Sequence, residues 1–251
     1  MSVVFRMAAA GLGLCVLFVA GCCGAGPFTH AAPESREVLV AVHADAPVNI
    51  DGKLDDAVWR QARAYPLYGP NGEFSKEGGV IRLAWDKDYF YLGAELTDLD
   101  LVAEMRVDQE HLYRYGDAVE LFLKPEGDKC FWELYVTPAG NKTTFFWPSR
   151  GRGWLPSMQR GTSGLRVAAV CNGTLDNWRD KDEGWTAEVA MPIKDLTQYG
   201  AVFAPGAAWR ILVGRYNYSR YLDQRELTSA PALPKADFLE VDSYGALRIE
   251  E

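Results

Sequence analysis

Short runs of alternating apolar and polar residues, separated by turn-forming residues, fill most of this 251-residue chain. The pattern is clearest at residues 80–85 and 89–96, which are rich in β-branched and aromatic residues and are joined by Asp86-Lys87-Asp88 as a hairpin turn. The same alternation predicts strands at residues 118–123, 131–136, 142–147, 165–170, 185–190, 208–216 and 244–249. Many short strands with one short N-terminal helix, predicted at residues 55–63, indicate an all-β fold, an antiparallel β-sandwich.

The first 21 residues predict export. Arg6 is the only charged residue before the apolar run at residues 8–20, which has the length of a signal peptide and is too short to span a bilayer. The run ends in Val19-Ala20-Gly21-Cys22, which resembles the bacterial lipobox and implies lipidation of Cys22. An ordinary secretory signal with incidental cysteines is the alternative. Since Cys23 follows rather than an aspartate, we expect a secreted protein that is lipid-anchored to the bacterial membrane, at the outer membrane.

The remainder divides into a tether and one domain. Residues 22–36 are small and polar with two prolines, a composition that does not fold and is typical of a linker. Residues 37–251 are then the single folded domain. Without Arg6, the 26 basic residues become 25 against 34 acidic ones, a net charge of −9. This charge argues against nucleic acid as a partner, and membrane contact is expected through the lipid anchor alone.

Two cysteines of the domain, Cys130 and Cys171, lie at ends of predicted strands. In an oxidising compartment they can form a disulfide, and two buried thiols are the alternative. No spacing of cysteine and histidine suggests a zinc site.

Six segments, in this order, carry a family resemblance: NIDGKLDDAVW at residues 49–59, WDKDYFYL at 85–92, GDAVELF at 116–122, WELYVTP at 132–138, GWTAEVAMP at 184–192 and YGALR at 244–248. Together they resemble family 9 carbohydrate-binding modules and their relatives in the DOMON-like superfamily. The resemblance covers residues 46–249 and implies an immunoglobulin-like or DOMON-like sandwich that binds sugar and does not cleave it.

The resemblance also implies a sugar site. Family 9 modules hold a sugar between two tryptophans, one before the Asp-x-Val-Glu strand and one before the closing Tyr-Gly segment. Both are absent here: Arg114 falls at the first position with Tyr113 and Tyr115 on either side, and Phe238 falls at the second. We expect these rings to stack on a saccharide, with core or edge packing as the alternative for Tyr113 and Phe238.

The strand at residues 118–123 supplies the polar part of the expected site. Its alternation places Ala118, Glu120 and Phe122 on one face, which must be solvated at Glu120. Glu120 falls on a family glutamate that contacts the sugar. A family arginine on the next strand is replaced by Glu133.

Weaker candidates lie elsewhere. The basic loop at residues 147–154 carries Trp147 and Trp154, which can fold over a ligand or belong to a loop without a partner. Arg215 and Asn217 end a strand with planar groups that suit vicinal hydroxyls, although Arg215 can instead pair with an acid such as Glu226.

The family also holds structural calcium in some members, for which Asp98 and Asp100 offer oxygens. We expect no other cofactor.

We therefore predict a noncatalytic module that binds poly- or oligosaccharide on the cell envelope, in support of polysaccharide degradation and beside glycan-degrading enzymes. No Gly-x-Ser-x-Gly motif or histidine triad spacing indicates an enzyme. Two alternatives stay open. One is a structural or interaction module that lacks a sugar site, and the other is a haem-binding DOMON-like domain with Met105 and His111 as ligands.

Overall fold

The computed structural model describes residues 37–149 and 158–251, and residues 35–251 form one compact unit. The signal, the tether, Cys22 and Trp154 lie outside the described residues. Strands dominate, as predicted: β1(Val38–His43), β2(Tyr65–Pro66), β3(Gly79–Trp85), β4(Tyr89–Thr97), β5(Ala118–Pro125), β6(Phe131–Val136), β7(Lys142–Trp147), β8(Gln159–Arg160), β9(Arg166–Asn172), β10(Gly184–Pro192), β11(Trp209–Asn217), β12(Glu226–Ala230) and β13(Gly245–Ile249). The helical segments are short: α1(Ala57–Gln61), α2(Ile193–Leu196), η1(Pro70–Gly72), η2(Leu112–Arg114) and η4(Val241–Ser243).

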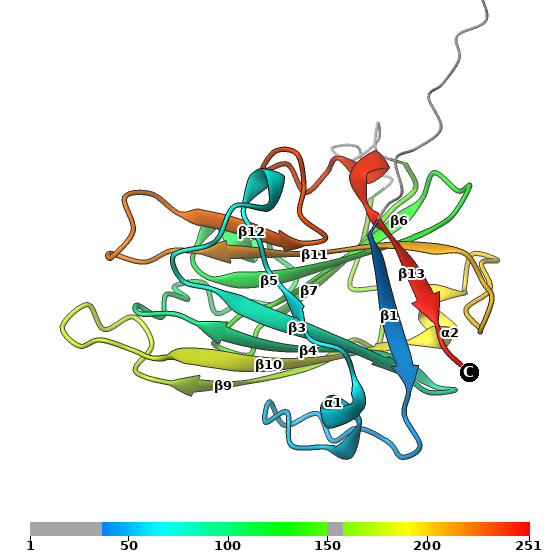
Figure 1. Ribbon diagram of the computed structural model, residues 1–251, viewed down its shortest axis with the longest axis horizontal. Coiled ribbons are helices and arrows are strands. Elements are labelled where there is room, and N and C mark those ends of the chain that lie inside the picture. The colour runs from blue at the N-terminus through cyan, green and yellow to red at the C-terminus, as the bar shows by residue number, and fades with distance from the viewer. Residues whose placement is uncertain (1–36, 150–157) are drawn as a thin grey trace, which may run out of the picture. The chain divides into compact units, whose positions relative to one another are not determined.

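The strands join one curled, mixed sheet rather than a purely antiparallel sandwich. Its order is β8-β7-β6-β5-β11-β13-β1-β3-β4-β10-β9, with β12 beside β11 and β2 beside β3. Strand β1 is parallel to both of its neighbours: Val38–Ala41 pairs with β13, and Val42–His43 pairs with β3. In Figure 1, β1 and β13 run at one side between a layer containing β5, β11 and β12 and a layer containing β3, β4, β9 and β10. The expectation of an antiparallel sandwich is corrected in this respect, because the alternation of residues predicts strands but not the partners of β1.

The main core lies between these two layers, which we call the β5 half-sheet (β5 to β8 and β11 to β13) and the β4 half-sheet (β2 to β4, β9 and β10). Buried residues of both contribute to it, among them Val119, Leu121 and Leu123 of β5 and Leu83 and Leu92 of β3 and β4. The predicted alternation of β5 is therefore confirmed on this face.

A second core covers the other face of the β5 half-sheet. It contains Phe122, Phe131, Tyr135, Phe145, Trp147, Leu212, Phe238 and Tyr244, with Tyr113 and Tyr216 partly buried against it. The face predicted to be solvated at Glu120 is thus covered by aromatic side chains, and Glu120 is only 2% exposed.

Helix α1 packs on the outer face of the β4 half-sheet. The Trp59 ring contacts Gly93, where a Cβ would lie 3.2 Å from it, and Trp59 Nε1 donates to Glu188 Oε1 at 2.8 Å. The helix is shorter than predicted, and its N-cap is Asp56, whose side chain accepts from the Asn49 amide instead of capping the helix.

The two cysteines of the domain were expected to form either a disulfide or two buried thiols, and the structure shows thiols. Cys130 and Cys171 are both free and partly buried, and no disulfide joins them. Cys171 Sγ donates to the Pro138 carbonyl at 3.4 Å, and burial raises the pKa of this thiol to about 11. In residues 37–149 and 158–251, no helix is long and apolar enough to cross a membrane.

Candidate functional site

Two glutamates occupy the outer face of the β5 half-sheet, on neighbouring strands. Glu120 of β5 lies opposite Tyr135 on β6 and opposite Gly214 on β11. Glu133 lies opposite Phe122, two residue pairs further along the same ladder. Strand alternation therefore brings both carboxyl groups to one face.

The two carboxyl groups are buried, and among the described residues no cation pairs with either of them. Glu133 is 5% exposed and accepts hydrogen bonds from the Tyr135 hydroxyl and from Trp147 Nε1, the latter at 2.5 Å. Glu120 Oε1 has no hydrogen-bond partner among the described residues. Burial raises the pKa of Glu133 to about 7, and burial together with repulsion from Glu133 raises the pKa of Glu120 well above its ordinary value. The pair therefore retains a proton near neutral pH.

Four aromatic rings surround Glu120, and we call Tyr113, Tyr135, Tyr216 and Phe238 the aromatic face. Tyr113 stacks on Tyr216 with ring centroids 4.7 Å apart, and Phe238 meets Tyr216 edge-on at 5.3 Å. Tyr113 also meets Tyr135 edge-on at 6.1 Å. These geometries are the favourable ones for aromatic pairs.

Gly214 makes room for one of these rings. A Cβ at this position would lie 2.5 Å from the Phe238 ring, so Phe238 packs directly on the backbone of β11 beside Glu120. Because Gly214 has no side chain, the ring of Phe238 can lie at this place on β11.

Two arginines and a tyrosine form the rim of the aromatic face. The guanidinium of Arg114 lies 5.6 Å from the Tyr113 ring centroid, and that of Arg225 lies 5.6 Å from Tyr216. The Tyr218 hydroxyl donates to the Tyr113 carbonyl at 2.7 Å and so fixes the backbone of η2. The rim offers planar donors beside flat apolar rings.

The structure brings together several of the residues that the sequence pointed to. Tyr113, Glu120 and Phe238 meet on the aromatic face, and Arg114 lies at its rim. Trp147 is joined to this face by the hydrogen bond that its Nε1 donates to Glu133. Tyr115 is 45% exposed beside them. Phe238 and Trp147 are 6% and 5% exposed, so both act as walls of the site more than as open platforms.

Sequence reasoning missed two members of the aromatic face, Tyr135 and Tyr216. A signal for Tyr135 was present, because it shares the alternation of Glu133 on β6. Tyr216 is the next-to-last residue of β11, and the sequence had pointed to its neighbours Arg215 and Asn217 instead.

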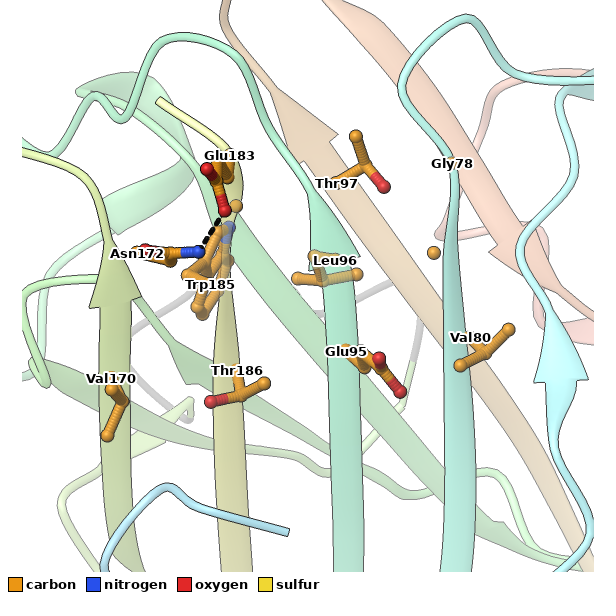
Figure 2. Close-up of a pocket in the computed structure, with 12 residues that line it drawn as sticks. Gly78, Val80, Glu95, Leu96, Thr97, Val170, Asn172, Glu183, Trp185 and Thr186 are labelled. Carbon is orange, nitrogen blue, oxygen red and sulfur yellow. Dashed lines mark hydrogen bonds between the residues drawn. The ribbon is translucent and has the colours of Figure 1, made fainter. Parts of the chain in front are cut away.

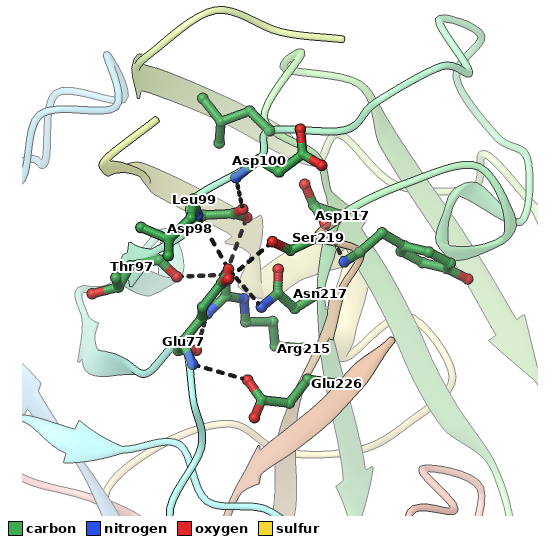
Figure 3. Close-up of polar contacts among 12 residues, drawn as sticks. Glu77, Thr97, Asp98, Leu99, Asp100, Asp117, Arg215, Asn217, Ser219 and Glu226 are labelled. Carbon is green, nitrogen blue, oxygen red and sulfur yellow. Dashed lines mark hydrogen bonds and ion pairs between the residues drawn. The ribbon is translucent and has the colours of Figure 1, made fainter. Parts of the chain in front are cut away.

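Arg215 and Asn217 point away from the aromatic face, which corrects their expected role. Arg215 is fully buried: its Nη1 donates to the carbonyls of Glu77 and Gly78, and its Nη2 contacts the Thr97 carbonyl and Asp98 Oδ2 at 2.8 and 3.1 Å. Asn217 donates to Glu77 at 3.2 Å. Figure 3 shows this network, in which Arg215 reaches from β11 to the ends of the β4 half-sheet. The alternation that exposes Tyr216 to the outer face necessarily turns both neighbours inward.

The acids considered for calcium are paired with arginines. Asp98 pairs with Arg215, and Asp100 pairs with Arg220 at 2.5 Å. Within the described residues, no group of three or more His, Cys, Asp or Glu side chains could hold a metal ion. Of the two residues considered for haem, His111 lies against the Phe145 ring at 4.8 Å, and Met105 packs on the second core.

A separate open hollow of about 680 Å³ lies on the outer face of the β4 half-sheet. Figure 2 shows Val80, Glu95, Thr186 and Val170 crossing it in one row from four neighbouring strands. This row contains no aromatic ring, and Trp185 packs in the main core, so the hollow lacks the flat apolar surface that sugars need.

The described residues thus form a β-rich domain that carries an aromatic face. The family described as "Carbohydrate family 9 binding domain-like" matches residues 50–204, and the chain belongs to this family. Its members are noncatalytic binding modules.

Solved structures share the fold. A candidate carbohydrate-binding protein from Bacteroides uniformis is 14% identical with a TM-score of 0.65, over 86% of this chain and 100% of the other. A family 9 carbohydrate-binding module from Caldicellulosiruptor kristjanssonii in complex with glucose is 14% identical with a TM-score of 0.58, over 85% and 96%. A module of the same family and organism in complex with cellotriose is 16% identical with a TM-score of 0.53, over 85% and 94%. A comparison with curated proteins found no match.

Proposed function

We propose that this protein is a noncatalytic saccharide-binding protein whose ligand occupies the aromatic face. The observation that carries the proposal is the pair of partly buried rings, Tyr113 and Tyr216, above a buried Glu120 oxygen that has no hydrogen-bond partner in the part of the chain that the structure describes. Family membership and the glucose and cellotriose complexes of two similar structures support it.

The residues suggest how a sugar is held. Flat tyrosine faces suit the C–H side of a pyranose, and Glu120 offers an acceptor to a hydroxyl group. Because Glu120 is 2% exposed, a ligand reaches it when the Tyr113 ring swings off Tyr216. The turn η2 stays in place during this movement, since Tyr218 holds it through the Tyr113 carbonyl and not through the ring.

Isothermal titration with a panel of mono- and oligosaccharides, including glucose, cellobiose, cellotriose and xylose oligomers, tests the proposal. We expect Tyr113→Ala to weaken binding roughly threefold to tenfold through loss of stacking. Glu120→Leu should weaken it by roughly tenfold, because the hydrogen bond between this side chain and a sugar hydroxyl is lost. Trp178→Ala is the matched control, because this ring is 71% exposed, lies on the segment between β9 and β10 and contacts Arg179 rather than a ring of the aromatic face. Saturable binding that neither site variant changes would contradict this location.

A structural or interaction module without a sugar site is the second candidate. One observation favours it: Tyr216 fills the space between Tyr113 and Phe238, where a sugar would otherwise lie. A folded protein that binds no saccharide of the panel would decide for this candidate.

We also propose that Cys22 is lipidated and displays the domain on the cell envelope, at the outer membrane, where it supports polysaccharide degradation by separate enzymes. The lipobox-like sequence before Cys22 supports this. Metabolic labelling with a fatty-acid analogue should mark the wild-type protein and Cys23→Ser but not Cys22→Ser. Equal labelling of both variants would count against it.

A further inference from the structure

A second hollow lies directly beside the aromatic face. It measures about 550 Å³, within the size range of ligand sites, and lies between the turn at residues 69–76 and the segment at residues 222–227. Arg225 lines this hollow and also holds its guanidinium over the Tyr216 ring. Leu227 lines it as well, pairs with Tyr216 across β12 and β11, and packs on the second core. The hollow and the aromatic face are therefore contiguous.

An exposed aromatic ring stands at this hollow. Phe74 is 90% exposed and lines it, and the ring of Tyr68 meets Phe74 edge-on with centroids 5.9 Å apart. Full exposure of a phenyl ring costs hydration free energy that burial against a ligand would recover. The ring thus offers a flat apolar surface that the fold leaves uncovered.

The walls of the hollow are held together by polar contacts. Glu226 at the start of β12 accepts from the backbone amides of Lys76 and Glu77 at 2.7 and 3.2 Å, which ties the turn to the strand. Lys76 also pairs with Asp223 at 3.0 Å. With Gln224 and Arg225, the hollow combines one flat ring with several planar or charged hydrogen-bonding groups.

We propose that this hollow is a second saccharide subsite, which takes further units of the same chain whose first unit occupies the aromatic face. The ligand is then an oligosaccharide or polysaccharide rather than a single sugar, and the inference rests on the proposed function. A single ring among charged and amide groups suits a hydroxylated chain. It does not suit an apolar protein partner, which would need a larger uncovered apolar area.

Titration calorimetry against oligomers of increasing length tests the subsite. The probes are glucose, cellobiose, cellotriose and cellotetraose, with the matching xylose series, against the full-length protein and its Phe74→Ala and Trp178→Ala variants. Phe74 is so exposed that its removal leaves the thermal midpoint unchanged, which the same samples verify. We expect wild-type affinity to rise with chain length. Phe74→Ala should bind the monosaccharide normally and the longer oligomers roughly threefold to tenfold more weakly, and Trp178→Ala should match the wild type throughout.

Two results would overturn the subsite while leaving the proposed function intact. One is a protein that binds the monosaccharide but whose affinity does not rise when further sugar units are added. The other is an affinity that rises with chain length to the same extent in Phe74→Ala as in the wild type. If no sugar of any length bound to the folded wild-type protein, the proposed function would fail and the subsite with it.

Discussion

Glu120 and Glu133 show how single residues give the aromatic face its character. Their carboxyl groups are buried beneath tyrosine rings, and Glu133 is held by Tyr135 and Trp147. Burial disfavours the charged form, so the folded protein holds a proton that the unfolded chain would release.

This difference predicts a pH-dependent stability. Because the pKa of Glu133 is raised from 4.5 to about 7 in the folded state, the folded protein binds more protons than the unfolded chain in this window. The free energy of unfolding should therefore fall as pH rises from about 4.5 to about 7, by at most about 1.4 kcal/mol per pH unit for one proton. Urea unfolding at several pH values should show that the free energy of unfolding falls less steeply with rising pH in Glu133→Gln than in the wild type. Identical slopes would show that this carboxyl group does not titrate as expected.

Gly214 predicts a stability effect of its own. An added Cβ would lie 2.5 to 2.9 Å from atoms of the Phe238 ring, so Gly214→Ala must displace that ring. We expect a loss of about 1–3 kcal/mol in the free energy of unfolding, the usual cost of overpacking. Gly164→Ala is the control, because its Cβ would lie 3.4 Å from the nearest atom, an ordinary contact. Equal unfolding midpoints for the two variants would contradict the close packing of Phe238.

At the scale of elements, the alternation of residues predicted nine strands to within two residues at each end, including β5 with its buried face. It missed β1 and β12 and the two-residue strands β2 and β8. Strand β12 reads ELTSA, which is too short and too polar to stand out.

The members of the site could be predicted only where they follow from a single strand. Glu120 was found through the alternation of β5, but Tyr216 belongs to the site because β11 pairs with β5 and brings Tyr216 beside Tyr113. Such pairings between distant segments are not encoded in local periodicity.

Strand β1 also supports a prediction, because it changes partners along its length. Near the change, the Val40 amide donates to the hydroxyl of buried Tyr65 at 2.7 Å. Tyr65→Phe leaves this amide without its partner and should lower the free energy of unfolding by about 1–3 kcal/mol. Tyr68→Phe is the matched control, because the structure gives the Tyr68 hydroxyl no hydrogen bond within the described residues. Chemical denaturation compares the two, and a neutral Tyr65→Phe would show that this hydrogen bond does not stabilise β1.

At the scale of the whole molecule, Arg215 connects the two half-sheets. It projects from β11 and contacts Thr97 and Asp98 at the end of β4 and the backbone before β3. Removal of a fully buried guanidinium leaves Asp98 as an uncompensated acid, so Arg215→Met should cost about 3–5 kcal/mol in the free energy of unfolding. Arg210→Met removes a more exposed pair with Glu126 and should cost about 1 kcal/mol or less. Comparable losses in the two variants would mean that Arg215 does not join the half-sheets.

The location of the ligand is tested most directly by NMR. Amide chemical shifts can be followed while the tightest-binding saccharide of the panel is added to the protein. We predict that the largest changes occur at Tyr113, Glu120, Tyr135 and Tyr216 on the outer face of the β5 half-sheet. Changes confined to Val80, Glu95 and Thr186 on the β4 half-sheet, with the aromatic face undisturbed, would contradict the proposal.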